Sequence, residues 1–194
     1  MLPPVILASQ SPRRRDILRA EGVDFTIIVR DTDELHDASM PAEELCLHNA
    51  RAKALAVAAE HPEATVIGAD TLVFLDARPL GKPQDEEEAR AMLRMLSGRT
   101  HLVCTGVSLQ SPLGMHDMTV LTEVTFRQLA EEDIHRYMEL VHVLDKAGAY
   151  ALQEHGEMII ERVNGDTNNV IGLPAARVAA ALQAWGYNLP NRPE

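Results

Sequence analysis

Two long runs with strand character constrain the fold of this chain more than any other feature. They lie near His101–Leu109 and Met115–Phe126, and a turn around Pro112-Leu113-Gly114 joins them. Two such runs separated by a short glycine-containing turn are typical of an antiparallel hairpin. We therefore expect a hairpin here, and with it a sheet that contains antiparallel strands.

The rest of the chain alternates between strand and helix signals. Further strands are expected at Val5–Ala8, Phe25–Val29, Thr65–Leu75, Ala149–Gln153 and Met158–Val163. Helices are expected from Ser11 towards Gly22, at Pro41–Glu60, after Asp85, at Glu131–Val141 and at Pro174–Trp185. This order predicts an α/β (mixed α+β) fold, in which helices pack on a mixed sheet. Because no repeat or linker interrupts the pattern, we expect one domain over residues 1–194.

Charge and composition narrow the classes of function. The 194 residues include 18 Lys plus Arg and 29 Asp plus Glu, which gives a formal net charge of −11. Such a balance argues against binding to nucleic acid polymers or to anionic membranes. No apolar run approaches the roughly 18 residues of a membrane span, and the start has no signal-peptide pattern. Two isolated cysteines provide no disulfide framework. We expect a cytoplasmic enzyme or binding protein.

Three consecutive arginines follow the first expected strand. Ser11 is a good N-cap and Pro12 suits the first helical position, so Arg13, Arg14 and Arg15 fall in the first turn of a helix. Cations are unfavourable there, because the helix N-terminus already carries partial positive charge. Either the arginines are simply solvated or they fan out around a bound anion; free N–H groups at this helix end favour a phosphate.

Acidic residues occur at two notable positions. Asp70 interrupts an apolar strand, where a lone carboxylate is unfavourable unless it is paired or binds a metal; a satisfied carboxylate at a kink after Gly68 is the alternative. Its neighbour Thr71 faces the other side of a regular strand. The segment Asp31–Asp37 offers oxygen ligands for Mg²⁺ or Mn²⁺, although an acidic loop can equally be solvated.

Polar side chains in other segments could reach a ligand. Lys53 lies on the expected inward face of its helix, so it either snorkels to solvent or contacts a ligand. Lys82 stands in a stiff Gly-Lys-Pro turn. Lys146 could meet a phosphate and Gln153 could read a base edge, whereas a surface ion pair at Asp145-Lys146 is the alternative.

Taken as an ordered set, these segments resemble the Maf family of nucleoside triphosphate pyrophosphatases. The motifs are LASQSPRR, Asp33-Glu34, AKA, GADT, LGKP, SGRTHLVCTGV, DKAGAY and GLP, between Val5 and about Pro174. The resemblance implies an elongated, twisted mixed sheet flanked by helices, with two lobes around a central cleft, similar to inosine triphosphate pyrophosphatases. It also implies a homodimer and a divalent cation, Mg²⁺, Mn²⁺ or Co²⁺.

The resemblance also implies roles for individual residues. Asp70 matches the general base and Lys82 a catalytic cation, while Glu34 and Asp70 would hold the metal. The substrate-binding positions implied are Ser9, Arg13, Arg14, Lys53, Thr71, Lys146 and Gln153.

The implied activity is metal-dependent hydrolysis of a nucleoside triphosphate to the monophosphate and pyrophosphate. Arg13, Thr71 and Gln153 match the family branch that prefers dTTP and UTP. One alternative is a nucleotide-binding regulator of cell division with little catalysis. Another is a hydrolase that releases orthophosphate.

Overall fold

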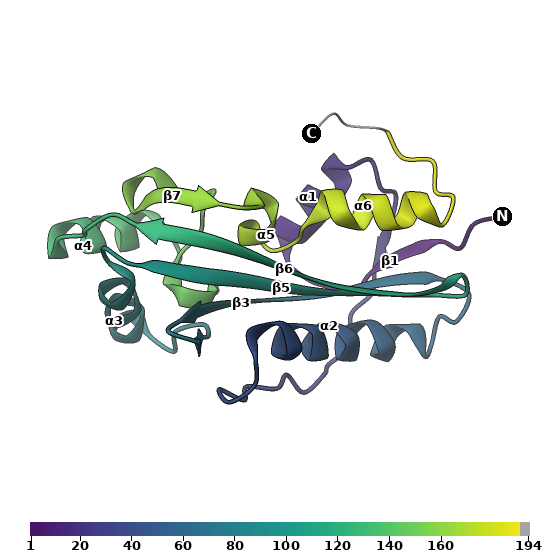
Figure 1. Ribbon diagram of the computed structural model, residues 1–194, viewed down its shortest axis with the longest axis horizontal. Coiled ribbons are helices and arrows are strands. Elements are labelled where there is room, and N and C mark those ends of the chain that lie inside the picture. The colour runs from purple at the N-terminus through teal and green to yellow at the C-terminus, as the bar shows by residue number, and fades with distance from the viewer. Residues whose placement is uncertain (191–194) are drawn as a thin grey trace.

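Seven strands form one mixed sheet in the computed structural model, which describes residues 1–190 (Figure 1). The strands are β1 (Val5–Leu7), β2 (Thr26–Ile27), β3 (Thr65–Leu75), β4 (Arg78–Leu80), β5 (Thr100–Ser111), β6 (Gly114–Phe126) and β7 (Ile160–Asn164). Their order is β2-β1-β3-β5-β6-β7, and β4 pairs with β3. β1 runs parallel to β2 and β3, whereas the other pairings are antiparallel. The predicted mixed sheet and its β5–β6 hairpin are therefore confirmed.

Six helices form within residues 1–190, and two of them begin directly after the capping residues that the sequence predicts. The six are α1 (Pro12–Ala20), α2 (Ala42–Ala58), α3 (Glu86–Leu96), α4 (Glu131–Leu140), α5 (Thr167–Ile171) and α6 (Ala175–Ala184). The side chain of Ser11 accepts a bond from the N–H of Arg14, and Asp85 accepts one from Glu88. No helix within residues 1–190 is long and apolar enough to cross a membrane.

The strand expected at Ala149–Gln153 does not form. A 3₁₀ turn at Ala147–Ala149, η1, precedes an irregular segment instead. Gly148 and Ala149 have φ values of 69° and 62°, a left-handed conformation that an extended strand excludes. The short elements β4 and α5 were not expected from the sequence, because three and five residues carry little periodicity.

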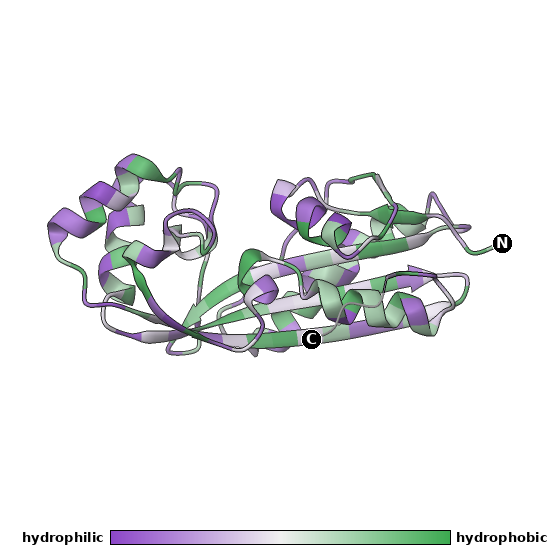
Figure 2. Cartoon of the chain, turned by 90° about the horizontal axis from the view of Figure 1, so that it is seen from above, coloured by the Kyte–Doolittle hydropathy of each residue, from purple (hydrophilic) through white to green (hydrophobic). Residues whose placement is uncertain are grey.

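Side chains at the two ends of the sheet form separate cores. At one end α3 and α4 pack on β3, β5 and β6 through residues such as Leu93, Tyr137 and Phe126. At the other end α2 covers one face of the sheet, while α1 and α6 cover the opposite face (Figure 1). Viewed from above, the two groups of helices stand apart along the sheet as two lobes (Figure 2).

Two glycines let α2 lie against the sheet at very short range. A Cβ atom added to Gly68 on β3 would overlap the carbonyl of Ala50, and one added to Gly106 on β5 would overlap the backbone of Cys46. β3 pairs continuously with β5 from Val66 to Phe74, so Gly68 marks close packing and not a kink. This close approach brings the inward side chains of α2 onto β3.

Candidate active site

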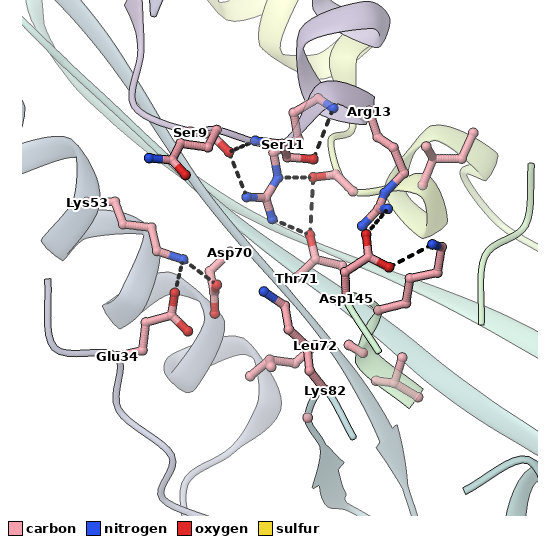
Figure 3. Close-up of a pocket in the computed structure, with 18 of the residues that line it drawn as sticks. Ser9, Ser11, Arg13, Glu34, Lys53, Asp70, Thr71, Leu72, Lys82 and Asp145 are labelled. Atoms are coloured by element: carbon pink, nitrogen blue, oxygen red, sulfur yellow. Dashed lines mark hydrogen bonds and ion pairs between the residues drawn. The ribbon is translucent and has the colours of Figure 1, made fainter. Parts of the chain in front are cut away.

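A cleft of about 990 Å³ lies between the two lobes. This volume is at the upper end of the range of small-molecule sites. The ten residues to which the family resemblance assigns a role all line it, although they come from widely separated segments: Ser9, Arg13, Arg14, Glu34, Lys53, Asp70, Thr71, Lys82, Lys146 and Gln153. The structure thus brings the whole set into one cavity. Figure 3 shows Lys53, Asp70 and Lys82 among them.

Lys53 stands between the two acids of the cleft. Its Nζ lies 2.7 Å from Oδ1 of Asp70 and 2.7 Å from Oε1 of Glu34. Asp70 on β3 is buried, so the ammonium compensates a charge that would otherwise be unfavourable in the interior. Lys53 does not snorkel to solvent but contacts two protein carboxylates, and Asp70 is a paired carboxylate.

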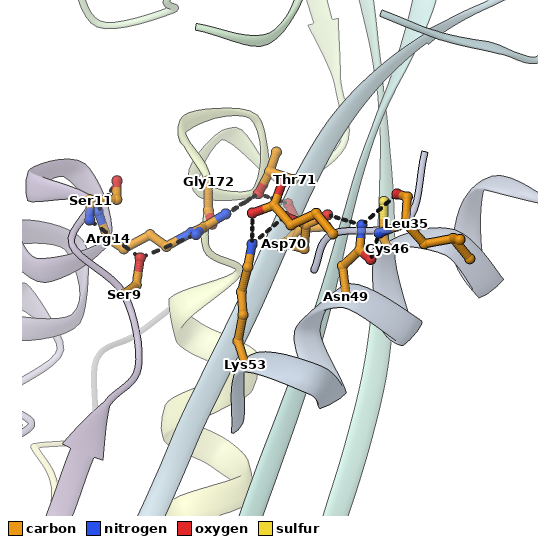
Figure 4. Close-up of polar contacts among 12 residues, drawn as sticks. Ser9, Ser11, Arg14, Leu35, Cys46, Asn49, Lys53, Asp70, Thr71 and Gly172 are labelled. Carbon is orange, nitrogen blue, oxygen red and sulfur yellow. Dashed lines mark hydrogen bonds and ion pairs between the residues drawn. The ribbon is translucent and has the colours of Figure 1, made fainter. Parts of the chain in front are cut away.

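Asn49, one turn before Lys53 on α2, was not assigned a role from the sequence. Its Nδ2 donates to Oδ2 of Asp70 at 3.1 Å and to the carbonyl oxygen of Leu35 at 3.1 Å. Its Oδ1 accepts a bond from the N–H of Leu35 at 2.8 Å (Figure 4). The available signal was an amide on the inward face of a helix, four residues before a lysine.

The two carboxylates of this site could hold a hard cation only if a bound phosphate and water supply the remaining oxygen ligands. Within residues 1–190, no group of three or more His, Cys, Asp or Glu is placed to hold a metal ion. Glu34 and Asp70 nevertheless lie around one ammonium, and both supply oxygen. Mg²⁺ commonly binds through one or two carboxylates plus substrate phosphates and water, which matches this donor set.

Arg14 is fixed by three contacts on the other side of β3. Its Nε donates to the carbonyl of Gly172 at 2.8 Å, its Nη1 to Ser9 Oγ at 3.2 Å and its Nη2 to Thr71 Oγ1 at 3.0 Å. Burial lowers the pKa of Arg14, and the charge of Asp70 opposes that shift. A guanidinium held this rigidly presents its remaining N–H groups in a fixed direction.

Thr71 faces away from Asp70, as a regular strand requires. The Thr71 hydroxyl lies within hydrogen-bond distance of Arg14, of Thr105 Oγ1 at 2.9 Å and of the Gly172 carbonyl at 3.1 Å. These protein contacts use the bonding capacity of a hydroxyl. The clearest effect of Thr71 in this structure is therefore to hold Arg14.

The three arginines of the first helical turn do not fan out as one trap. Arg13 and Arg14 line the cleft, whereas Arg15 does not and its Nε lies 2.9 Å from the carboxylate of neighbouring Asp16. Successive helical residues point about 100° apart, so three in a row cannot all face one cavity. The expectation that Arg15 contributes is corrected.

Lys146 is buried and its ammonium is surrounded by protein oxygens. Nζ lies 2.8 Å from Asp145 Oδ1, 2.6 Å from the carbonyl of His142 and 3.3 Å from Glu154 Oε2. Asp145 also faces Arg13 across the cleft at 3.7 Å. Partial burial raises the pKa of Asp145, but the bond and charge of Lys146 together with the charge of Arg13 lower it by more, so the pKa lies below its usual value.

Lys82 and Gln153 are the more available side chains of the cleft. Both are exposed, and Figure 3 shows the Lys82 ammonium pointing towards the centre of the cavity. Among the residues that the structure describes, Lys82 has no hydrogen-bond or ion-pair partner. Gln153 makes a single long contact, 3.5 Å to Glu154. Both can therefore meet a ligand without breaking a strong internal bond.

Comparison with known sequences gives a consistent result. The family model described as "Maf-like protein" matches residues 4–185. A dTTP/UTP pyrophosphatase of Akkermansia muciniphila is 70% identical over 187 residues, covering 96% of this chain and 99% of that protein. The dTTP/UTP pyrophosphatase of Myxococcus xanthus is 47% identical, with 97% and 95% covered, and that of Bacillus velezensis is 45% identical, with 93% and 96% covered.

Solved structures show the same fold at low sequence identity. The Staphylococcus aureus Ham1 protein superimposes with a TM-score of 0.54 at 16% identity, covering 94% of this chain and 99% of that one. A HAM1 protein from Coxiella burnetii gives a TM-score of 0.50 at 14% identity, with 95% and 100% covered. The elongated mixed sheet with helices on both faces is therefore shared with these proteins.

Proposed function

The chain belongs to the Maf-like protein family, and from this we propose that it is a pyrophosphatase that hydrolyses dTTP and UTP to the monophosphate and pyrophosphate. The relatives named dTTP/UTP pyrophosphatase, at up to 70% identity over nearly the full chain, support this activity. The observation that carries it is the convergence of Arg14, Lys53 and Lys82 with Asp70 in one cleft of an otherwise acidic chain.

The basic side chains bind the triphosphate. The fixed guanidinium of Arg14 and the exposed ammonium of Lys82 meet phosphate oxygens, and both stabilise the negative charge that the leaving pyrophosphate develops. Because the whole chain carries a charge of −11, this attraction is local to the cleft.

Asp70 is the general base of the proposed reaction. It takes a proton from a water molecule, whose oxygen forms the new bond to the α-phosphorus while the bond to the bridging oxygen of the β-phosphate breaks. The bonds from Lys53 and Asn49 orient the carboxylate for this transfer. Pyrophosphate leaves with the electron pair of the broken bond, and the monophosphate remains.

We propose that Glu34 and Asp70 hold a divalent cation, Mg²⁺, Mn²⁺ or Co²⁺, together with phosphate oxygens. When bound there, such an ion neutralises phosphate charge and lowers the pKa of a coordinated water. In this arrangement Lys53 gives up part of its contact with the two acids to the cation and turns towards a phosphate.

The nucleobase of the substrate is recognised by other residues of the cleft. Gln153 and Arg13 are available to the edge of uracil or thymine, and Thr71 acts through its bond to Arg14. A site that satisfies the polar edge of one base rejects others, because a mismatch leaves buried polar groups unpaired.

A nucleotide panel tests the function. Purified protein with Mg²⁺ or Mn²⁺ is given dTTP, UTP, CTP, ATP and GTP, and pyrophosphate and orthophosphate are quantified separately. We expect pyrophosphate from dTTP and UTP, and a loss of roughly 10²–10⁴ in rate for Asp70→Asn. Asp76→Asn, at an exposed turn, is the matched carboxylate-to-amide control and keeps full activity.

Two other results of the panel would contradict the proposal. Orthophosphate as the product would identify a different hydrolase. Tight nucleotide binding with no product from any of the five nucleotides would identify a regulator without catalysis.

A further inference from the structure

The acid Glu34 stands on a segment without regular structure. Residues 28–41, between β2 and α2, form no helix or strand, and the Glu34 side chain is 43% exposed. Asp70, by contrast, is fixed within the central strand β3. Under the proposed function both carboxylates act on one substrate, yet Asp70 lies on a regular strand and Glu34 on an irregular segment. A further contact is therefore needed to fix the position of Glu34.

Asn49 ties this segment to α2 by a two-point contact. Its side-chain amide pairs with the backbone of Leu35, the residue after Glu34, by accepting from the N–H at 2.8 Å and donating to the carbonyl at 3.1 Å. Two bonds of opposite direction to the backbone of one residue fix its orientation as well as its distance. The side chain of Leu35 adds a packing contact with the cluster around Cys46 and Leu72.

The same amide also bonds to Asp70. Its second N–H donates to Oδ2 at 3.1 Å, so both donors of the Asn49 side chain are used and its oxygen accepts one bond. The opposite amide orientation would place an oxygen against the carboxylate and an N–H against an N–H. Asn49 is only 2% exposed, so no water competes for these bonds.

Lys53 also joins the two acids, but differently. Its charge attracts both carboxylates, yet a lysine side chain has four rotatable bonds and no fixed fork, so it sets the separation of the acids weakly. Under the proposed function it also turns towards phosphate. Asn49 keeps its partners when substrate binds, because they are the backbone of Leu35 and Oδ2 of Asp70.

We propose that Asn49 is a positioning residue, a buried amide that sets the place of Glu34 relative to Asp70 before substrate binds. This rests on the proposed pyrophosphatase function of the same site. Asn49 touches neither the nucleotide nor the attacked phosphorus; it acts through the two acids. Misplacement of a catalytic group by about 1 Å can lower a rate on the order of 10²-fold.

Two substitutions separate this role from simple packing. Asn49→Ala removes all three bonds together with volume. Asn49→Asp keeps the size but replaces the donor by an oxygen that faces two other oxygens, the carbonyl of Leu35 and the carboxylate of Asp70. Val57→Ala is the matched control, since Val57 is a fully buried residue of the same helix in a different apolar cluster.

The experiment measures amide hydrogen exchange and steady-state kinetics on the full chain. In Asn49→Ala, which removes the acceptor of the Leu35 N–H, we expect the Leu35 amide to lose protection by more than tenfold. In both Asn49 variants we expect kcat for dTTP with Mg²⁺ to fall roughly 10- to 100-fold while KM stays within about threefold. Val57→Ala is expected to lower the melting temperature while leaving kcat and the Leu35 amide unchanged.

The result that overturns the proposal is a kcat within threefold of wild type in either Asn49 variant, or an equal loss in Val57→Ala. Failure of the proposed function looks different, because wild type itself then releases no pyrophosphate. In that case the exchange measurement still decides whether Asn49 holds the Glu34 segment, and unchanged protection of Leu35 in Asn49→Ala rejects that too.

Discussion

Buried ionisable side chains in this chain are accommodated in two distinct ways. Asp70 has an ammonium and an amide at hydrogen-bond distance, and both compensate the burial of its carboxylate. His101, in the core of the lobe that contains α3, instead stays neutral. Its Nε2 lies 2.7 Å from the hydroxyl of Tyr150, and its Nδ1 has no partner among the described residues. Burial lowers the pKa of His101 to about 4.

His101 therefore makes folding stability depend on pH. Because the pKa is lower in the folded state than its ordinary value of 6.5, the unfolded chain binds the proton first as pH falls. The stability is fully present above about pH 6.5 and is lost towards pH 4, by a total on the order of 3 kcal/mol.

Denaturant unfolding at several pH values between 7 and 4 measures this loss. His101→Gln keeps a polar partner for Tyr150 but does not titrate, so its free energy of unfolding should fall less steeply than that of wild type over the same range. Parallel curves for the two proteins would show that another group is responsible.

Most of the candidate site could be predicted at the residue scale, since charged residues in motifs are visible in a sequence. Asn49 could not, because an uncharged amide on a helix resembles many surface asparagines until its partners are known. Lys146 and Lys82 look alike in the sequence, yet three oxygens enclose Lys146, whereas Lys82 has no partner within residues 1–190. That difference arises from the surrounding backbone and not from the residue type.

At the scale of elements, the packing of α2 on β3 and β5 brings together the groups of the candidate site. Asn49 and Lys53 lie four residues apart on one face of α2, so both meet Asp70 when the helix lies close to the sheet. Gly68 and Gly106 permit that distance. The capped helices and the hairpin were predictable from local pattern, whereas the strand expected at Ala149–Gln153 was wrong because a backbone conformation with positive φ replaced it.

Gly106→Ala tests this packing. The added methyl group overlaps the backbone of Cys46, so α2 must move away from the sheet. We expect a loss of about 1–3 kcal/mol in the free energy of unfolding, and a fall in kcat of more than tenfold because the contacts to Asp70 lengthen. Denaturant unfolding and pyrophosphate release measure the two effects.

Gly156→Ala is the control, because a Cβ atom there meets only ordinary contacts of 3.4 Å or more. A Gly106→Ala protein with wild-type kcat would mean that the distance of α2 from the sheet does not matter for the reaction.

The whole molecule has a net charge of −11, yet its cleft is lined by several lysine and arginine side chains. The two have opposite effects on the approach of a nucleotide, since the overall charge repels it and the cleft attracts it. Salt at 0.1 M screens charges over about 10 Å, so it weakens distant repulsion and local attraction to different extents. The cleft lies between the lobes, where low-dielectric walls concentrate the local field.

The salt dependence of kcat/KM shows which effect dominates. We expect kcat/KM for dTTP to fall roughly three- to tenfold between about 25 and about 250 mM NaCl at constant Mg²⁺. The reason is that attraction by the lysine and arginine side chains of the cleft governs binding, and salt screens it. Lys82→Met should show a shallower dependence. A rise of kcat/KM with salt in the wild type would instead mean that repulsion by the acidic surface controls the approach.

The sequence by itself determined the alternation of strands and helices, the hairpin, the helix starts at Ser11 and Asp85, and the opposite faces of Asp70 and Thr71. These depend on neighbours a few residues away, through capping and the periods of strand and helix. Only the tertiary structure decided which charges are paired and which are free. Arg14 and Gly172, for example, are 158 residues apart in the chain, and a bond between them depends on how whole elements pack.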